Sequence, residues 1–153
     1  MKWFLCPLFL VSITFSNAQV KLPRLISDNM VLQRHTPIHI WGWAAAGEQV
    51  RIRFMGKDYS ATTSPDKTWA LTLPAQKAGG PYDMEIDASN HLTIKNILVG
   101  DVWVCSGQSN MEWPLSRSFQ PQETIQRSSD PNLRLWTVPH AISDIPRRET
   151  QGA

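Results

Sequence analysis

Apolar and polar residues alternate one by one in several short segments of the N-terminal two thirds of the chain. The segments with this two-residue period are 38–41, 50–54, 69–73 and 82–87. Such alternation is typical of strands that bury one face in an antiparallel sheet. The residues that we therefore expect on the inner face are Val50, Ile52, Phe54, Trp69, Leu71 and Leu73.

Turn-forming residues separate these segments at short intervals. The separating segments lie at 46–48, 55–58, 64–67, 78–81 and 89–90 and are rich in Gly, Pro, Asp and Ser. Short strands at this spacing are typical of a small β-sandwich. The pattern predicts an antiparallel, immunoglobulin-like β-sandwich as an accessory domain over residues 19–97.

The pattern changes after Val99. Residues 102–105 form an apolar run without alternation, which predicts a strand buried on both faces, as in a parallel sheet. Cys105 belongs to this run, so we expect its thiol to be buried. A second strand is predicted at 133–138, where Leu, Arg, Leu and Trp lead the segment.

A helix is expected between these two strands. Pro114 excludes a long helix directly after the first strand, because proline lacks an N–H. Pro121 suits a first helical turn, and Glu123 and Arg127 have the spacing of an i,i+4 ion pair. The resulting β–α–β order predicts the beginning of an α/β/α domain over residues 98–153.

A serine between two amides follows the apolar run. Ser109 lies beyond Gly107 and is flanked by Gln108 and Asn110. A serine on a turn after a buried strand is where α/β hydrolases place a nucleophile, with backbone N–H groups near the developing oxyanion. The alternative is a simple helix N-cap. Ser106 precedes the turn, which favours a structural role.

The motif around Ser109 resembles the sialate O-acetylesterase family, a group of SGNH-type serine hydrolases. The segments that carry this resemblance are 25–33, 79–82, 96–101 and 100–114, the last with Gly-Gln-Ser-Asn-Met at 107–111. The resemblance implies that Ser109 is the nucleophile. Gln108 and Asn110 either hold the turn by side-chain hydrogen bonds or contact polar groups of the substrate.

The resemblance also implies partners for Ser109 in later sequence blocks. SGNH enzymes use a His near the C-terminus, preceded by an Asp, and further oxyanion donors from a Gly and an Asn. No such blocks are found up to Ala153. We therefore expect the chain to be the N-terminal part of an enzyme, with little or no esterase activity by itself.

Other candidate catalytic groups are weaker. His140 lacks an Asp three residues before it and is interpreted as a loop residue. Asp101 and Glu112 flank the motif and could suggest glycoside hydrolysis, but single acids near a strand end more often cap turns or pair with an Arg. No Cys/His cluster has metal-ligand spacing, so neither a metal nor a cofactor is expected.

Composition excludes some classes of partner. Lys and Arg number 15 against 13 Asp and Glu, and no basic run occurs, so nucleic acid is not an expected partner. No segment is long and apolar enough for a membrane span. The seven tryptophans fit either the core or a platform for sugar rings.

The first 18 residues have the pattern of a cleavable signal peptide. Lys2 precedes an apolar stretch at 3–15, and Ser16-Asn17-Ala18 fits a cleavage site. The expected location is therefore secreted or periplasmic. Cys6 would leave with the peptide, so Cys105 would have no cysteine partner for an internal disulfide.

Together, the residues and the resemblance predict a carbohydrate O-acetylesterase that removes acetyl groups from sialic acid or related sugars through a serine acyl-enzyme. Its expected partner is an acetylated carbohydrate. Two alternatives stay open: an esterase of acetylated plant polysaccharide, such as an acetylxylan esterase, and a non-catalytic carbohydrate-binding or spacer module.

Overall fold

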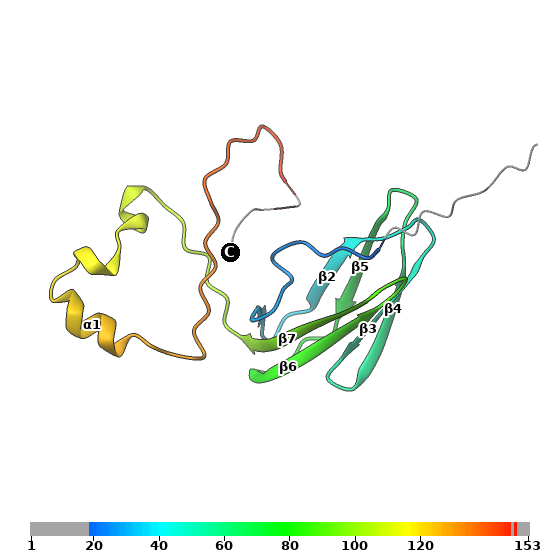
Figure 1. Cartoon of the computed structure of the whole chain (residues 1–153), viewed down its shortest axis with the longest axis horizontal. Coiled ribbons are helices and arrows are strands. Elements are labelled where there is room, and N and C mark those ends of the chain that lie inside the picture. Colours follow the sequence, from blue (N-terminus) through cyan, green and yellow to red (C-terminus); the bar gives the residue numbers. More distant parts are fainter. Residues whose placement is uncertain (1–18, 148, 150–153) are drawn as a thin grey trace, which may run out of the picture.

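The computed structural model describes residues 19–147 and 149, so the predicted signal peptide lies outside the described residues. Seven strands form the larger part of the fold (Figure 1). They are β1 (Val31–Gln33), β2 (Ile38–Trp43), β3 (Gln49–Phe54), β4 (Lys57–Thr62), β5 (Thr68–Leu73), β6 (Gly79–Asp87) and β7 (His91–Gly100). Three short helices follow, namely η1 (Ser109–Glu112), η2 (Leu115–Arg117) and α1 (Pro121–Arg127).

The strands are arranged in two sheets. A five-stranded sheet has the order β1-β7-β6-β3-β4, and β2 pairs with β5 in a separate two-stranded sheet. All pairs are antiparallel except that of β1 with β7, which is parallel. The antiparallel prediction is thus confirmed for most of the fold, whereas the parallel pair was not predicted.

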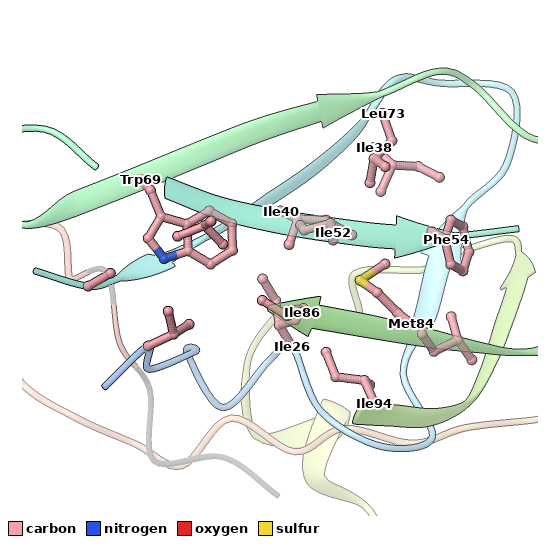
Figure 2. Packing of buried hydrophobic residues seen from close by; sticks show 14 residues of the cluster. Ile26, Ile38, Ile40, Ile52, Phe54, Trp69, Leu73, Met84, Ile86 and Ile94 are labelled. Carbon is pink, nitrogen blue, oxygen red and sulfur yellow. The ribbon is translucent and has the colours of Figure 1, made fainter. Parts of the chain in front are cut away.

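One hydrophobic core is shared by both sheets (Figure 2). The two-stranded sheet contributes Ile38, Ile40, Trp69 and Leu73, while β3 and β6 contribute Val50, Ile52, Phe54, Met84 and Ile86. Five of the six residues predicted on the inner face are buried, and Leu71 is partly buried against the cluster. The two-residue alternation therefore identified the core face correctly. The immunoglobulin-like classification stays a prediction.

A β-bulge interrupts β7. Tyr82 pairs with Ile97 and Met84 pairs with Ile94, so β7 has one residue more than β6 between these pairs. Asn96, in the bulge, has a positive φ of 58°, which Asn tolerates better than most residues. The extra residue shifts the alternation of β7 and explains why its sequence did not predict a regular strand.

Beyond β7 the chain leaves the sheets, and the prediction of a buried strand at 102–105 is wrong. Trp103 and Val104 are 84% and 91% exposed, and Cys105 is exposed as well. A strand requires a neighbour for its backbone groups, and no strand of the described chain runs beside this segment. Apolar composition alone therefore does not form a strand here.

The predicted strand at 133–138 is also absent, for the same reason. Leu135 is 83% exposed in an extended segment that no described strand pairs with. The helix between the two segments is confirmed: α1 begins at Pro121, and Glu123 Oε1 lies 3.0 Å from Arg127 Nη1. The expected β–α–β unit is therefore reduced to its helix, and the α/β/α class stays a prediction.

Candidate active site

Two sequence segments that carry the family resemblance lie side by side in the fold. In the parallel pair of β1 with β7, Val31 is opposite Leu98 and Gln33 is opposite Gly100. Just before β1, the Asn29 side-chain oxygen accepts a hydrogen bond from Asn96 Nδ2 at 2.6 Å. The opening segment therefore fixes the end of β7, from which the chain proceeds to the serine motif.

The first residues after β7 are held by Gln33, the last residue of β1, and by Arg34, which follows it. Arg34 Nε donates to Asp101 Oδ1 at 2.7 Å, and Val102 N–H donates to Gln33 Oε1 at 2.7 Å. The Arg34 guanidinium, by this hydrogen bond and by its charge, holds the pKa of the Asp101 carboxyl below its ordinary value. Asp101 is therefore a positioning group, as the pairing alternative expected, rather than a free carboxylate poised for glycosidase chemistry.

Ser109 is the first residue of the one-turn helix η1. Gln108, its N-cap, has an extended backbone (φ −91°, ψ −170°), and Met111 N–H donates to the Gln108 carbonyl at 2.8 Å. Gly107 leaves room for the Met111 side chain, because a Cβ there would lie 2.7 Å from Met111 Cγ. The turn predicted at Gly107 is thus present, although no strand precedes it, and Ser109 is exposed.

The two amides beside Ser109 are exposed and do not cap the helix. Gln108 makes no side-chain capping hydrogen bond. Within the described part of the chain, neither Gln108 nor Asn110 has a side-chain hydrogen bond that would hold the turn. Both side chains are therefore free to meet a ligand. Ser106 is exposed too, so burial does not distinguish it from Ser109.

Glu112 and His140 come together, which the sequence did not predict. His140 Nε2 lies 2.6 Å from Glu112 Oε1, and both side chains are largely exposed. Residues three apart in a 3₁₀-helix lie on the same side, so Glu112 shares a side of η1 with Ser109. Among the described residues no hydrogen bond joins His140 to Ser109. A histidine that activates serine needs that second contact.

Two further histidines, His39 and His91, lie on strands of the β-rich part. His39 Nδ1 is 3.0 Å from Thr72 Oγ1, and His91 Nδ1 is 2.6 Å from Asp87 Oδ1. These contacts join neighbouring strands and account for both residues as surface groups. In the described residues, no group of three His, Cys, Asp or Glu side chains could hold a metal ion.

A groove of about 890 Å³ lies beside the candidate site. It is bounded by the segments 25–32, 98–103 and 132–136, which belong to the opening segment, the end of β7 and the extended segment after α1. In Figure 1 the orange segment passes beside the chain that leaves β7. Ser109 does not line the groove, but the segment leading to it does.

Comparison with known proteins relates the chain to carbohydrate esterases. No profile of a known protein family matches it. It is 30% identical over 126 residues to a sialate O-acetylesterase of Rattus norvegicus, which covers 74% of this chain and 23% of the relative. A sialate O-acetylesterase of Homo sapiens is 29% identical over 126 residues, with 74% and 24% covered.

The chain is related to the sialate O-acetylesterases. A crystal structure of a carbohydrate acetylesterase from Xanthomonas citri matches with a TM-score of 0.84 and 35% identity. This match covers 88% of the present chain and 31% of the solved chain. Residues 1–100 could not supply that coverage alone, so the similarity extends past β7. The chain spans less than a quarter of the length of the curated relatives that it matches.

Among the described residues of the chain, no helix has the length and apolar character to cross a membrane.

Proposed function

We propose that the whole protein to which this chain contributes is a carbohydrate O-acetylesterase. The observation that carries this proposal is the match, at a TM-score of 0.84, to a solved carbohydrate acetylesterase. The names of the curated relatives agree with it, since they are sialate O-acetylesterases. The reaction is hydrolysis of an acetyl ester on a sugar hydroxyl.

Ser109 is the proposed nucleophile. Its Oγ attacks the acetyl carbonyl, its proton passes to a general base, and the carbonyl oxygen carries the developing negative charge. Backbone N–H groups at the start of η1 can stabilise that charge, because Ser109 is its first residue. The tetrahedral intermediate collapses to acetyl-Ser109 and the free sugar, whose oxygen takes the proton, and water then releases acetate.

Gln108 and Asn110 are proposed to contact the substrate. Both are exposed beside Ser109, and neither is engaged in the turn. An amide provides both a donor and an acceptor, which suits the hydroxyl groups of a sugar. We assign the general base to residues outside the described part of the chain, because His140 contacts Glu112 and not Ser109.

The fold and the location form part of the same proposal. Residues 19–97 are an immunoglobulin-like accessory domain, and residues from 98 onward begin an SGNH-type α/β/α domain. Residues 1–18 are a signal peptide, which would direct the protein to the periplasm or the medium.

Two substrate classes are open to such an enzyme, and one experiment separates them. The whole protein is incubated with O-acetylated sialic acid and with acetylated xylan, and acetate release is measured. We expect release from at least one substrate and a loss of several orders of magnitude in Ser109→Ala. Absence of release from both substrates would contradict the esterase proposal and favour the alternative of a carbohydrate-binding module.

A further inference from the structure

The outer face of the two-stranded sheet carries an aromatic pair. Along β2, Ile38, Ile40 and Gly42 are the buried positions. The alternate positions Trp41 and Trp43 therefore lie on the opposite face of the strand. Their side chains are partly exposed rather than buried. Trp41 packs against the edge of the hydrophobic core, whereas Trp69 of β5 is buried in it.

Small residues lie across from the pair and leave it uncovered on one side. Ala70 is opposite Trp41, and Thr68 is opposite Trp43. Alternate residues of a strand are about 6.5–7 Å apart, so the two indoles occupy successive positions along one line. Two aromatic side chains in line on a sheet can contact successive rings of an extended ligand.

A hollow of about 560 Å³ lies over this aromatic pair. Its size and apolar floor are typical of a small-ligand site. Ser64 and Thr68 add hydroxyl groups, and Arg147 and Glu149 line its border. The two charges are opposite, and Glu149 Oε1 already accepts a hydrogen bond from the Arg24 N–H at 3.1 Å. The border therefore offers no net charge, which suits a neutral ligand with many hydroxyl groups.

The hollow shares two lining residues with the groove that reaches the segment after β7. Leu25 and Trp41 line both. The groove reaches Asp101 and Trp103 in the segment that leads to Ser109. A ligand on the aromatic pair could therefore extend toward the serine motif without leaving the surface of the protein.

We propose that Trp41 and Trp43 form a binding platform for two successive rings of a neutral pyranose oligosaccharide, which extends along the groove toward residues 101–105. The class of ligand is taken from the proposed function. The apolar faces of the sugar rings contact the indoles, and their hydroxyl groups meet the polar border. The platform makes the β-rich part a substrate-anchoring module.

The test is calorimetric titration of the full chain carrying Ser109→Ala, so that binding is scored without hydrolysis. The probes are xylohexaose, cellohexaose, xylose and sialyllactose. We expect at least one hexaose to bind. Xylose should bind more weakly, because one ring cannot contact both tryptophans, and sialyllactose should not displace the bound hexaose. Trp41→Ala and Trp43→Ala should each weaken binding roughly ten-fold.

Two further variants separate binding from folding. Ala70 is exposed, so Ala70→Arg should obstruct the platform and reduce binding without lowering the melting temperature. Phe119→Ala is the aromatic control, since Phe119 is 88% exposed and lines neither hollow. Absence of binding to both hexaoses, or unchanged binding in Ala70→Arg, would overturn the platform. Esterase activity of the whole protein is measured separately, so either proposal can fail alone.

Discussion

Arg34 Nε and Asp101 Oδ1 lie 2.7 Å apart, although 67 residues separate them in the sequence. The parallel pairing of β1 with β7 creates this contact, because it brings the ends of both strands to the same edge. Arg34 thereby holds the first residue of the segment that leads to Ser109. The contact therefore ties the opening segment of the chain to the segment that leads to the serine motif.

The pKa of Asp101 tests this contact directly. We expect it below the ordinary value of an aspartate because of the hydrogen bond from Arg34, and we expect Arg34→Gln to return it to the ordinary range. Because the folded-state pKa is lowered, the pair stabilises the fold above the unfolded-state pKa and stops doing so as pH falls through the folded-state pKa. The measurement is an NMR titration of the Asp101 carboxyl. An unchanged pKa in Arg34→Gln would show that the pair does not form in solution.

The core assignment predicts a large effect at Ile52. Its side chain is fully buried between the sheets, so Ile52→Ala should lower the free energy of unfolding by about 2–5 kcal/mol through lost transfer energy and a residual cavity. Arg51→Ala, on the exposed face of the same strand, should change it by no more than about 0.5 kcal/mol. Urea denaturation measures both. Equal effects of the two variants would contradict the assigned inner face.

The site geometry predicts little esterase activity for residues 19–153 alone. Serine is a weak nucleophile without an adjacent base, and no hydrogen bond connects Ser109 to a base among the described residues. Hydrolysis of p-nitrophenyl acetate by this chain should therefore equal that of its Ser109→Ala variant. Turnover above that control, if removed by His140→Ala, would mean that the Glu112–His140 pair activates the serine.

Much of the β-rich part could be predicted from local pattern. The alternation in β3 and β5 identified residues whose burial follows directly from strand geometry. The turn signals at 46–48, 64–67 and 89–90 lie between strands, but β6 begins at Gly79, inside the predicted turn 78–81, and β4 begins at Lys57, inside the predicted turn 55–58. β4 was missed because its inner face is only partly buried and carries just Tyr59 and Ala61 among polar residues. The parallel pairing of β1 could not be predicted, since it depends on contacts between distant segments rather than on period.

The segments 102–105 and 133–138 show the limit of reasoning from composition. Their apolar runs resemble buried strands, but burial and pairing require neighbours that the described residues do not provide. At the site, the motif predicted the turn at Gly107 and the exposure of Ser109. The contacts of Asp101 with Arg34 and of Glu112 with His140 join residues far apart in sequence, and no local signal specifies such partners.

The central claim is that Ser109 is the nucleophile, and covalent trapping tests it most directly. The whole protein is treated with a serine-directed organophosphate and digested, and the modified peptide is sequenced by mass spectrometry. We expect a label on Ser109, none on Ser106, and no label in this peptide from Ser109→Ala. Ser106→Ala should label as fully as the unmodified protein. A label on Ser106, or on a serine outside the motif with Ser109 untouched, would contradict the claim.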